Sequence, residues 1–134
     1  MPFSTALNNE LLDHVFGGAA YSAPATVYLA ASTSTPTAAG ANVTEPAGNG
    51  YARKAVTANS TNFPAASGGA ISNGVAMAFA TATGGAWGLI THIAIYDAAT
   101  DGTFLGYGAL SASKQIDAGD TLNLPIGDLD IQMT

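Results

Sequence analysis

The sequence predicts an all-β protein, a β-sandwich with one short N-terminal helix. Short runs rich in Val, Ile, Thr and aromatic residues recur along the chain, and clusters of Gly, Pro, Asn and Ser separate them, which is the pattern of strands joined by turns. Only one segment, near the N-terminus, has apolar residues at helical spacing. A chain of 134 residues fits one domain with a single core. We therefore expect residues 1–134 to form one domain, with the sandwich over about residues 21–134.

The N-terminal helix is expected over about residues 5–16. Its apolar residues recur at three- and four-residue intervals: Leu7, Leu11, Leu12 and Val15. Ser4 or Thr5 can cap its N-terminus, and Gly17 and Gly18 are suited to its C-terminus. A helix of this length is marginal when isolated in water, so we expect it to dock on another surface.

The strands are expected in these segments: residues 25–31, 51–58, 74–81, 88–97, 103–110, 121–125 and 128–133. The first of them alternates apolar and polar side chains, as a half-buried strand does. Residues 89–96 are apolar on both faces, which favours a central strand covered on both sides. Residues 97–102, which follow it, are typical of a hairpin turn, with Gly102 where a positive φ is needed.

Two long polar stretches, residues 32–50 and 59–74, interrupt the strands. Both are rich in Ser, Thr, Ala, Gly, Asn and Pro. Loops of this length without regular structure are uncommon in compact domains and are usually functional. We interpret them first as segments that contact a partner and second as linkers, and we expect that either can be disordered in the isolated protein.

The composition excludes several classes of function. Charged residues make up 9% of the chain, the net charge is −6, and the only cations are Arg53, Lys54 and Lys114, so no nucleic-acid partner is expected. No apolar run is long enough to span a membrane, and no membrane partner is expected. The first residues lack the pattern of a secretory signal, which indicates synthesis in the cytoplasm. The lack of cysteine removes disulfides, thiolate nucleophiles and Cys-ligated metals.

The two histidines give little support to a catalytic site. A Ser/His/Asp constellation needs a histidine that is held by a carboxylate near a hydroxyl. His14 falls near the C-terminal end of the expected helix, where the helix dipole mildly favours an imidazolium. His92 falls in the expected central strand, on the same face as Tyr96, where a hydrogen-bonded structural histidine is the favoured interpretation. We therefore expect that the protein is not an enzyme.

The aspartates of the turns are interpreted as structural. Asp97 and Asp101 flank a turn that lacks the alternating ligands and the terminal Glu of a calcium loop. Aspartates in turns usually accept hydrogen bonds from their own backbone, and the same explanation covers Asp117 and Asp120. No metal site is expected in either turn.

The remaining charged residues and the glycines lead to the same conclusion. Asp128 and Asp130 alternate along the last expected strand and are interpreted as its solvent face. The glycine pairs lack both a Walker lysine and Rossmann spacing. For the adjacent cations Arg53 and Lys54, protection of an edge strand and pairing with an acidic neighbour are equally open interpretations. We expect no catalytic, metal-binding or cofactor-binding residue, and no cofactor.

A series of motifs spans nearly the whole chain. It comprises STALNNELLDH (4–14), YSAPATVYLA (21–30), GYAR (50–53), TAT through WG (81–88), THIAIYDA (91–98) and GAL (108–110). In order and spacing these motifs resemble a family of small virion proteins of tailed bacteriophages, often labelled tail-fibre or hypothetical proteins, some of which are similar to capsid cement proteins. The resemblance implies a virion part with a β-sandwich or jelly-roll-like fold, assembled in many copies. It brings no catalytic motif with it.

Two functional hypotheses follow from this resemblance, and a third, against which the sparse histidines argue, is weighed beside them. The first is a head cement, or decoration, protein that binds the capsid exterior as a small homo-oligomer, a dimer or trimer, and bridges subunits of the major capsid protein. Its helix and polar stretches would make many weak contacts. The alternative is a tail-fibre or baseplate protein involved in host attachment. An exposed cluster of Trp and Tyr would mark it, and Trp87, the only tryptophan, suits a core or interface anchor equally. A small hydrolase is the third and weakest hypothesis.

Overall fold

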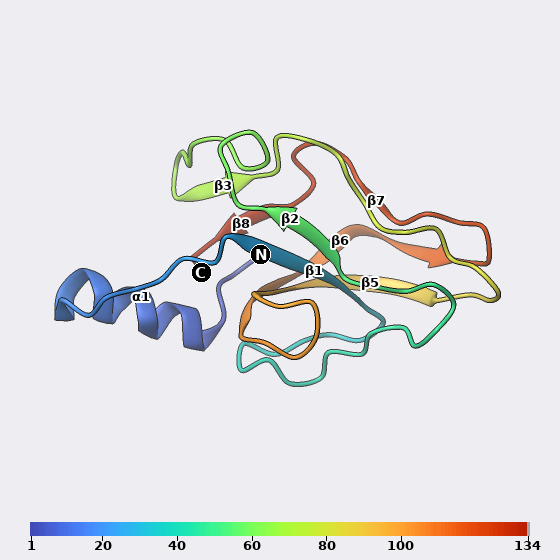
Figure 1. The fold of residues 1–134 in the computed structure, drawn as a ribbon, viewed down its shortest axis with the longest axis horizontal. Coiled ribbons are helices and arrows are strands. Elements are labelled where there is room, and N and C mark those ends of the chain that lie inside the picture. Colours follow the sequence, from blue (N-terminus) through green and yellow to red (C-terminus); the bar gives the residue numbers. More distant parts are fainter. Residues whose placement is uncertain (134) are drawn as a thin grey trace.

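An antiparallel β-protein with one helix is seen in the computed structural model, which describes residues 1–133 (Figure 1). In chain order its elements are α1 (Thr5–Gly17), β1 (Thr26–Ser32), β2 (Lys54–Thr57), β3 (Ala70–Ser72), β4 (Met77–Ala78), β5 (Gly88–Tyr96), β6 (Phe104–Ile116), β7 (Asn123–Leu124) and β8 (Asp130–Gln132). The predicted all-β class with one short N-terminal helix is confirmed. Within residues 1–133, no helix has the length and apolar character needed to cross a bilayer.

The largest sheet contains four antiparallel strands in the order β2-β1-β5-β6. Strands β1 and β5 lie inside it, and their paired residues Leu29 and Ile95 are 0% and 4% exposed. The next pair, Ala30 and Ala94, points to the opposite face and is also fully buried. The predicted central strand at residues 89–96, covered on both sides, is therefore confirmed.

A second, less regular layer covers one face of this sheet. It contains two antiparallel pairs, β3 with β8 and β4 with β7. Its buried side chains pack in one cluster with those of the large sheet: Met77, Leu122, Leu124 and Leu129 with Leu29 and Ile93. Because its paired strands are only two or three residues long, this layer differs from the larger facing sheets of a regular jelly roll.

Residues 1–3 connect the two layers at the β6 edge of the large sheet. Phe3 forms an antiparallel bridge with Gly106 in β6, and Pro2 forms a parallel bridge with Gln132 in β8. The N-terminal segment therefore lies between the two strands. It covers part of an edge that would otherwise be open to pairing with another chain.

The opposite face of the large sheet is covered by the polar stretch at residues 32–50. A small buried cluster lies beneath it: Ala30, Ala94 and Phe104, with Val43 packed against them. The Ser32 hydroxyl oxygen accepts a hydrogen bond from the Thr44 N–H at 3.1 Å. This stretch lies along the sheet, whereas the sequence suggested a segment that can be disordered.

The polar stretch at residues 59–74 is also bound to the rest of the protein. Asn59 Oδ1 accepts hydrogen bonds from the N–H groups of Thr61 and Asn62 at 3.1 and 2.8 Å. The Asn62 side chain donates to the Thr57 carbonyl at 2.8 Å. Strand β3, which the sequence did not predict, forms within this stretch. Its residues pair with β8, so the segment gains order from a distant part of the chain.

Strands β2 and β6 differ in length from the prediction for identifiable reasons. Strand β2 begins at Lys54, because its backbone pairing with β1 starts there, opposite Leu29. Strand β6 continues to Ile116 because its pairing with β5 shifts register near Thr91 and then resumes. In the hairpin turn between β5 and β6, Gly102 has a positive φ of 81°, as predicted.

Strand β8 is shorter than the expected strand at residues 128–133. Asp130 is exposed at its start, which agrees with the predicted solvent face. Asp128 does not lie on the strand, because its N–H donates to the Pro125 carbonyl at 3.0 Å in a turn. The proposed alternation of these two aspartates along one strand is therefore wrong.

Helix α1 has the predicted ends. The Ser4 hydroxyl oxygen accepts from the Leu7 N–H at 3.1 Å, so Ser4 is the N-cap. Gly18, with a φ of 69°, is the C-cap in the left-handed conformation that favours glycine. Leu7 is the buried residue of the helix. The helix is thus held to the core by its first turns.

Candidate functional site

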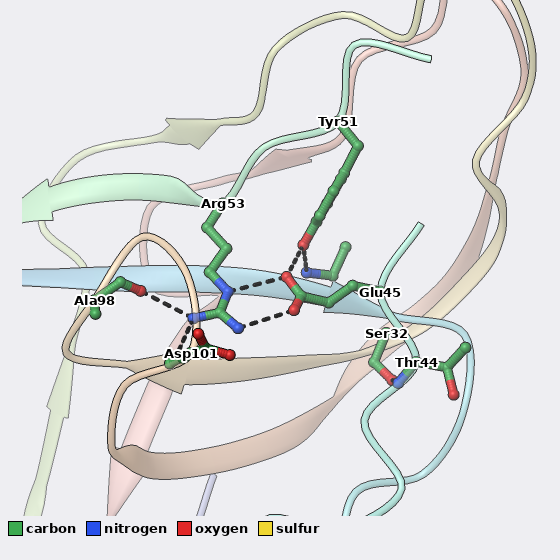
Figure 2. A network of polar contacts seen from close by, with 8 residues as sticks. Ser32, Thr44, Glu45, Tyr51, Arg53, Ala98 and Asp101 are labelled. Atoms are coloured by element: carbon green, nitrogen blue, oxygen red, sulfur yellow. Dashed lines mark hydrogen bonds and ion pairs between the residues drawn. The ribbon is translucent and has the colours of Figure 1, made fainter. Parts of the chain in front are cut away.

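Arg53 joins three parts of the chain beside the large sheet (Figure 2). Its guanidinium forms a two-pronged ion pair with Glu45, from Nε to Oε1 at 3.0 Å and from Nη2 to Oε2 at 2.9 Å. Nη1 donates to the carbonyls of Ala98 and Asp101, each at 2.9 Å. One planar side chain therefore fastens residues 32–50 to the turn between β5 and β6.

The surroundings of this ion pair keep it charged and fixed. The Tyr51 hydroxyl donates to Glu45 Oε1 at 2.6 Å and accepts from the Ala31 N–H at 3.0 Å. Burial alone would raise the pKa of Glu45, but hydrogen bonds from Arg53 and Tyr51, with the charge of Arg53, hold it below its usual value. Burial, and then the bond to Glu45, raise the pKa of Tyr51. The group acts as a structural clamp.

The structure separates the two interpretations of the adjacent cations. Arg53 pairs with an acidic neighbour and its side chain is only 8% exposed. Lys54 instead begins β2, which is an edge strand of the large sheet. A cation at that position discourages pairing with another chain. Each interpretation therefore applies to one of the two residues.

Both histidines make local hydrogen bonds, as the structural interpretation predicts. His14 Nδ1 lies 2.7 Å from the Ala19 carbonyl oxygen, just beyond the end of α1, so the ring donates to it. His92 Nδ1 lies 2.8 Å from the hydroxyl oxygen of its neighbour Thr91. The two rings lie on different elements, α1 and β5, and have no partner in common.

Asp97 and Asp120 bind the backbone of their turns, as predicted, whereas Asp117 Oδ1 accepts from the Gln115 side chain at 3.1 Å. Asp97 Oδ1 accepts from the Thr103 N–H at 2.6 Å. Asp120 Oδ2 accepts from the Asp117 N–H at 2.9 Å. No cluster of three or more His, Asp or Glu side chains that could hold a metal ion occurs within residues 1–133. These carboxylates shape turns.

Trp87 is a core anchor. Its side chain is 5% exposed, and its indole N–H donates to the Asn49 carbonyl at 3.0 Å. Its ring stands edge-on to Tyr51, with 5.1 Å between the ring centres. The exposed Trp and Tyr cluster that would mark an adhesin is therefore not formed around this tryptophan.

Asn73 is a structural residue that sequence reasoning missed. It is 2% exposed, and its side-chain amide donates to the carbonyls of Val75 and Pro125 at 2.8 and 2.9 Å. Its Oδ1 accepts from the Leu129 N–H at 2.9 Å. The side chain thus joins the segment between β3 and β4 to both ends of the turn between β7 and β8. In the sequence it is one asparagine among many in polar stretches.

The outer part of α1 carries the most exposed apolar surface of the described chain. Leu12, Val15 and Phe16 are 52%, 65% and 83% exposed. Their three- and four-residue spacing places them side by side on the helix, and we call them the helix face. Figure 1 shows α1 extending away from the sheets. An exposed apolar cluster of this kind marks an interaction surface. The sequence pattern located Leu12 and Val15, but it did not include Phe16.

An apolar groove opens beside the first turn of the same helix. It has a volume of about 390 Å³, and Leu7 lies in its wall. Its partly exposed walls include Phe3, Tyr21, Val27, Phe63, Ile71 and Ile131. None of the described residues that line it is charged. We call this feature the apolar groove.

A polar groove of about 830 Å³ also borders α1. Three carboxyl groups lie in its walls, those of Glu10, Asp13 and Asp97. The described residues that line it include no Lys or Arg. Two sides of the helix therefore differ in character, because one is acidic and the helix face is uncharged.

Comparison with known families identifies the class of protein. Residues 2–132 match the family model described as Podophage GP4 fiber I protein gp80. Together with the all-β fold, this match makes the chain a structural protein of a phage virion. Because the match covers nearly the whole chain, the protein belongs to the Podophage GP4 fiber I protein gp80 family. No curated protein matches the chain. The resemblance to phage virion proteins is confirmed, and the family description names a fibre, which was the alternative to capsid cement.

Proposed function

We propose that the protein is a structural subunit of a phage fibre involved in host attachment. The family match over residues 2–132 is the observation that supports this role over capsid cement. The cement hypothesis also depended on free polar segments that could lie along coat subunits. Residues 32–50 and 59–74 are instead tied to their own domain by hydrogen bonds, which weakens that support.

The proposed role includes no chemical reaction. The hydrogen bonds of His14 and His92 support this, because the partner of each Nδ1 is a backbone carbonyl or a threonine hydroxyl and not the carboxylate of a Ser/His/Asp site. We expect His92→Ala to lower stability only, with no loss of an enzymatic step in infection. The proposed partners are other copies of the chain and neighbouring virion proteins. Nucleic acid and membrane lipid are not among them, given the net charge of −6.

The abundance of the protein in purified virions tests the fibre role against cement. A fibre subunit is expected at a fixed ratio to a tail protein and at far fewer copies than the major capsid protein. Quantitative mass spectrometry of intact particles measures both ratios in one digest. An abundance close to that of the major capsid protein would contradict the fibre role and favour a cement protein on the capsid exterior.

A further inference from the structure

We infer that two copies of this protein form a reciprocal contact, in which the helix face of each copy binds in the apolar groove of the other. This contact deepens the proposed function and rests on its claim that other copies of the chain are partners, but it is tested on the isolated protein, so it can fail while the fibre role stands. Both features are present on every copy, and a single copy leaves both without a partner.

The helix face needs an apolar partner. Phe16, at its end, is 83% exposed, and Leu12 and Val15 lie beside it on the same side of α1. Within its own chain the helix buries Leu7, near its start, while its later turns leave the sheets (Figure 1). Large apolar side chains grouped in this way remain in contact with water unless another surface covers them.

The apolar groove is a suitable partner in chemistry and in size. Its volume of about 390 Å³ has room for several large side chains. Its described walls are uncharged, as is the helix face, so the contact places no charge in an apolar environment. The acidic residues of the helix, Glu10 and Asp13, line the other groove and stay outside the contact. Repulsion between two chains of net charge −6 is therefore not concentrated at this interface.

The positions of the two features favour a reciprocal contact between two copies. The helix face belongs to the later turns of α1, and Leu7 in its first turn lines the apolar groove, so both features lie at one end of the molecule. A two-fold axis at that end brings each helix to the other copy's groove at the same time.

The area that can be buried also favours a reciprocal contact. The three side chains of the helix face expose on the order of 300 Å². A reciprocal contact covers two helix faces and two groove walls, so it removes twice as much surface from water as a one-way contact does.

Substitutions of the helix face test the inference on the purified full-length protein. The double variant Leu12→Gln with Phe16→Gln removes apolar surface without adding charge, and glutamine is a good helix former, so the helix should remain. We expect the wild type to be a dimer by light scattering and sedimentation, and the double variant to have a dissociation constant at least ~10-fold higher. Ile126→Gln is the matched control, because Ile126 is 69% exposed in a turn outside both features. It should associate as the wild type does. Circular dichroism confirms that each variant is folded.

A cross-link identifies which surfaces meet, because the chain has no cysteine of its own. One preparation carries Val15→Cys, a change of similar size that leaves Leu12 and Phe16 in place. A second carries Ala58→Cys, an exposed residue in the groove wall. After mixing and mild oxidation, we expect more of the mixed 15–58 disulfide than of either symmetric product. Ile126→Cys mixed with Ala58→Cys should give no such excess. A wild type that stays monomeric at high concentration would refute the inference, as would a dimer that neither forms the 15–58 disulfide nor weakens in the double variant.

Discussion

Asn73 shows how much one buried side chain contributes to this fold. Its replacement by Ala would leave the carbonyls of Val75 and Pro125 and the N–H of Leu129 without their partner. Buried polar groups that lose their hydrogen bonds cost about 1–3 kcal/mol each, although water entering the site offsets part of this. We therefore expect Asn73→Ala to lower the free energy of unfolding by about 3 kcal/mol in urea denaturation.

The matched control is Asn9→Ala, since Asn9 is exposed on α1. Alanine is a better helix former than asparagine, so this change should be neutral or slightly stabilising. An equal loss of unfolding free energy in the two variants would show that the Asn73 hydrogen bonds do not stabilise the fold.

The Glu45–Arg53 clamp gives stability a defined dependence on pH. The pKa of Glu45 is lowered in the folded protein, so its contribution is complete above the unfolded-state pKa of about 4.3 and is lost as pH falls through the folded value. Glu45→Gln removes the charge and should cost about 1–2 kcal/mol at neutral pH. The difference in unfolding free energy between this variant and the wild type should become smaller below about pH 4.

Urea denaturation at several pH values measures this difference. Glu10→Gln is the control, because Glu10 is an exposed acidic residue of α1. It should change stability little at any pH. A Glu45→Gln deficit that stays constant into acid would mean that the carboxylate charge does not stabilise the folded state.

At the residue scale, the sequence predicted local chemistry better than long-range partners. The turn role of Asp97 and the N-cap at Ser4 followed from their neighbours in the chain. The partners of Asn73 lie up to 56 residues away, and no local pattern indicates them. Pairing with an acidic neighbour was one of two open interpretations for Arg53 and Lys54, but the sequence did not identify Glu45 as that neighbour.

At the scale of elements, the N-terminal segment is part of the sheet structure as well as the approach to the helix. Gly106 in β6 allows this close approach, because a Cβ there would lie 2.8 Å from the Pro2 carbonyl oxygen. We expect Gly106→Ala to displace residues 1–3 and to destabilise the fold by about 1–3 kcal/mol. Faster amide exchange at Phe3, whose N–H donates to the Gln132 carbonyl, would report the displacement.

Gly17→Ala is the control for a glycine without such a constraint. It is the last residue of α1, and nothing lies within 4 Å of its Cβ position. This change should stabilise the protein by about 0.5–1 kcal/mol, since Ala is the better helix former. Unchanged exchange at Phe3 in Gly106→Ala would contradict the proposed close packing.

The longer elements were predicted closely, whereas β4, β7 and β8 are shorter than the strands expected at residues 74–81, 121–125 and 128–133, and β3 was not predicted. The helix and strands β1 and β5 have clear periodicity, and their bounds agree with the expected ones to within one residue. Strands β3, β4, β7 and β8 are two or three residues long and exist only through pairing with distant segments. Their sequences carry too few residues for a period to be seen.

At the scale of the whole molecule, the fold leaves its main recognition surface at one end. The sheets bury their apolar residues in two clusters, and both long polar stretches are held against them. The helix face and the apolar groove remain open beside each other. A rigid domain with one such end is suited to serve as a repeated structural part.

The location of the protein on intact particles tests the central claim most directly. Gold-labelled antibodies against the purified protein, viewed by electron microscopy of whole virions, measure that location. The fibre role predicts gold on the fibres or at the tail, with the capsid surface unlabelled. Gold spread evenly over the capsid would contradict it.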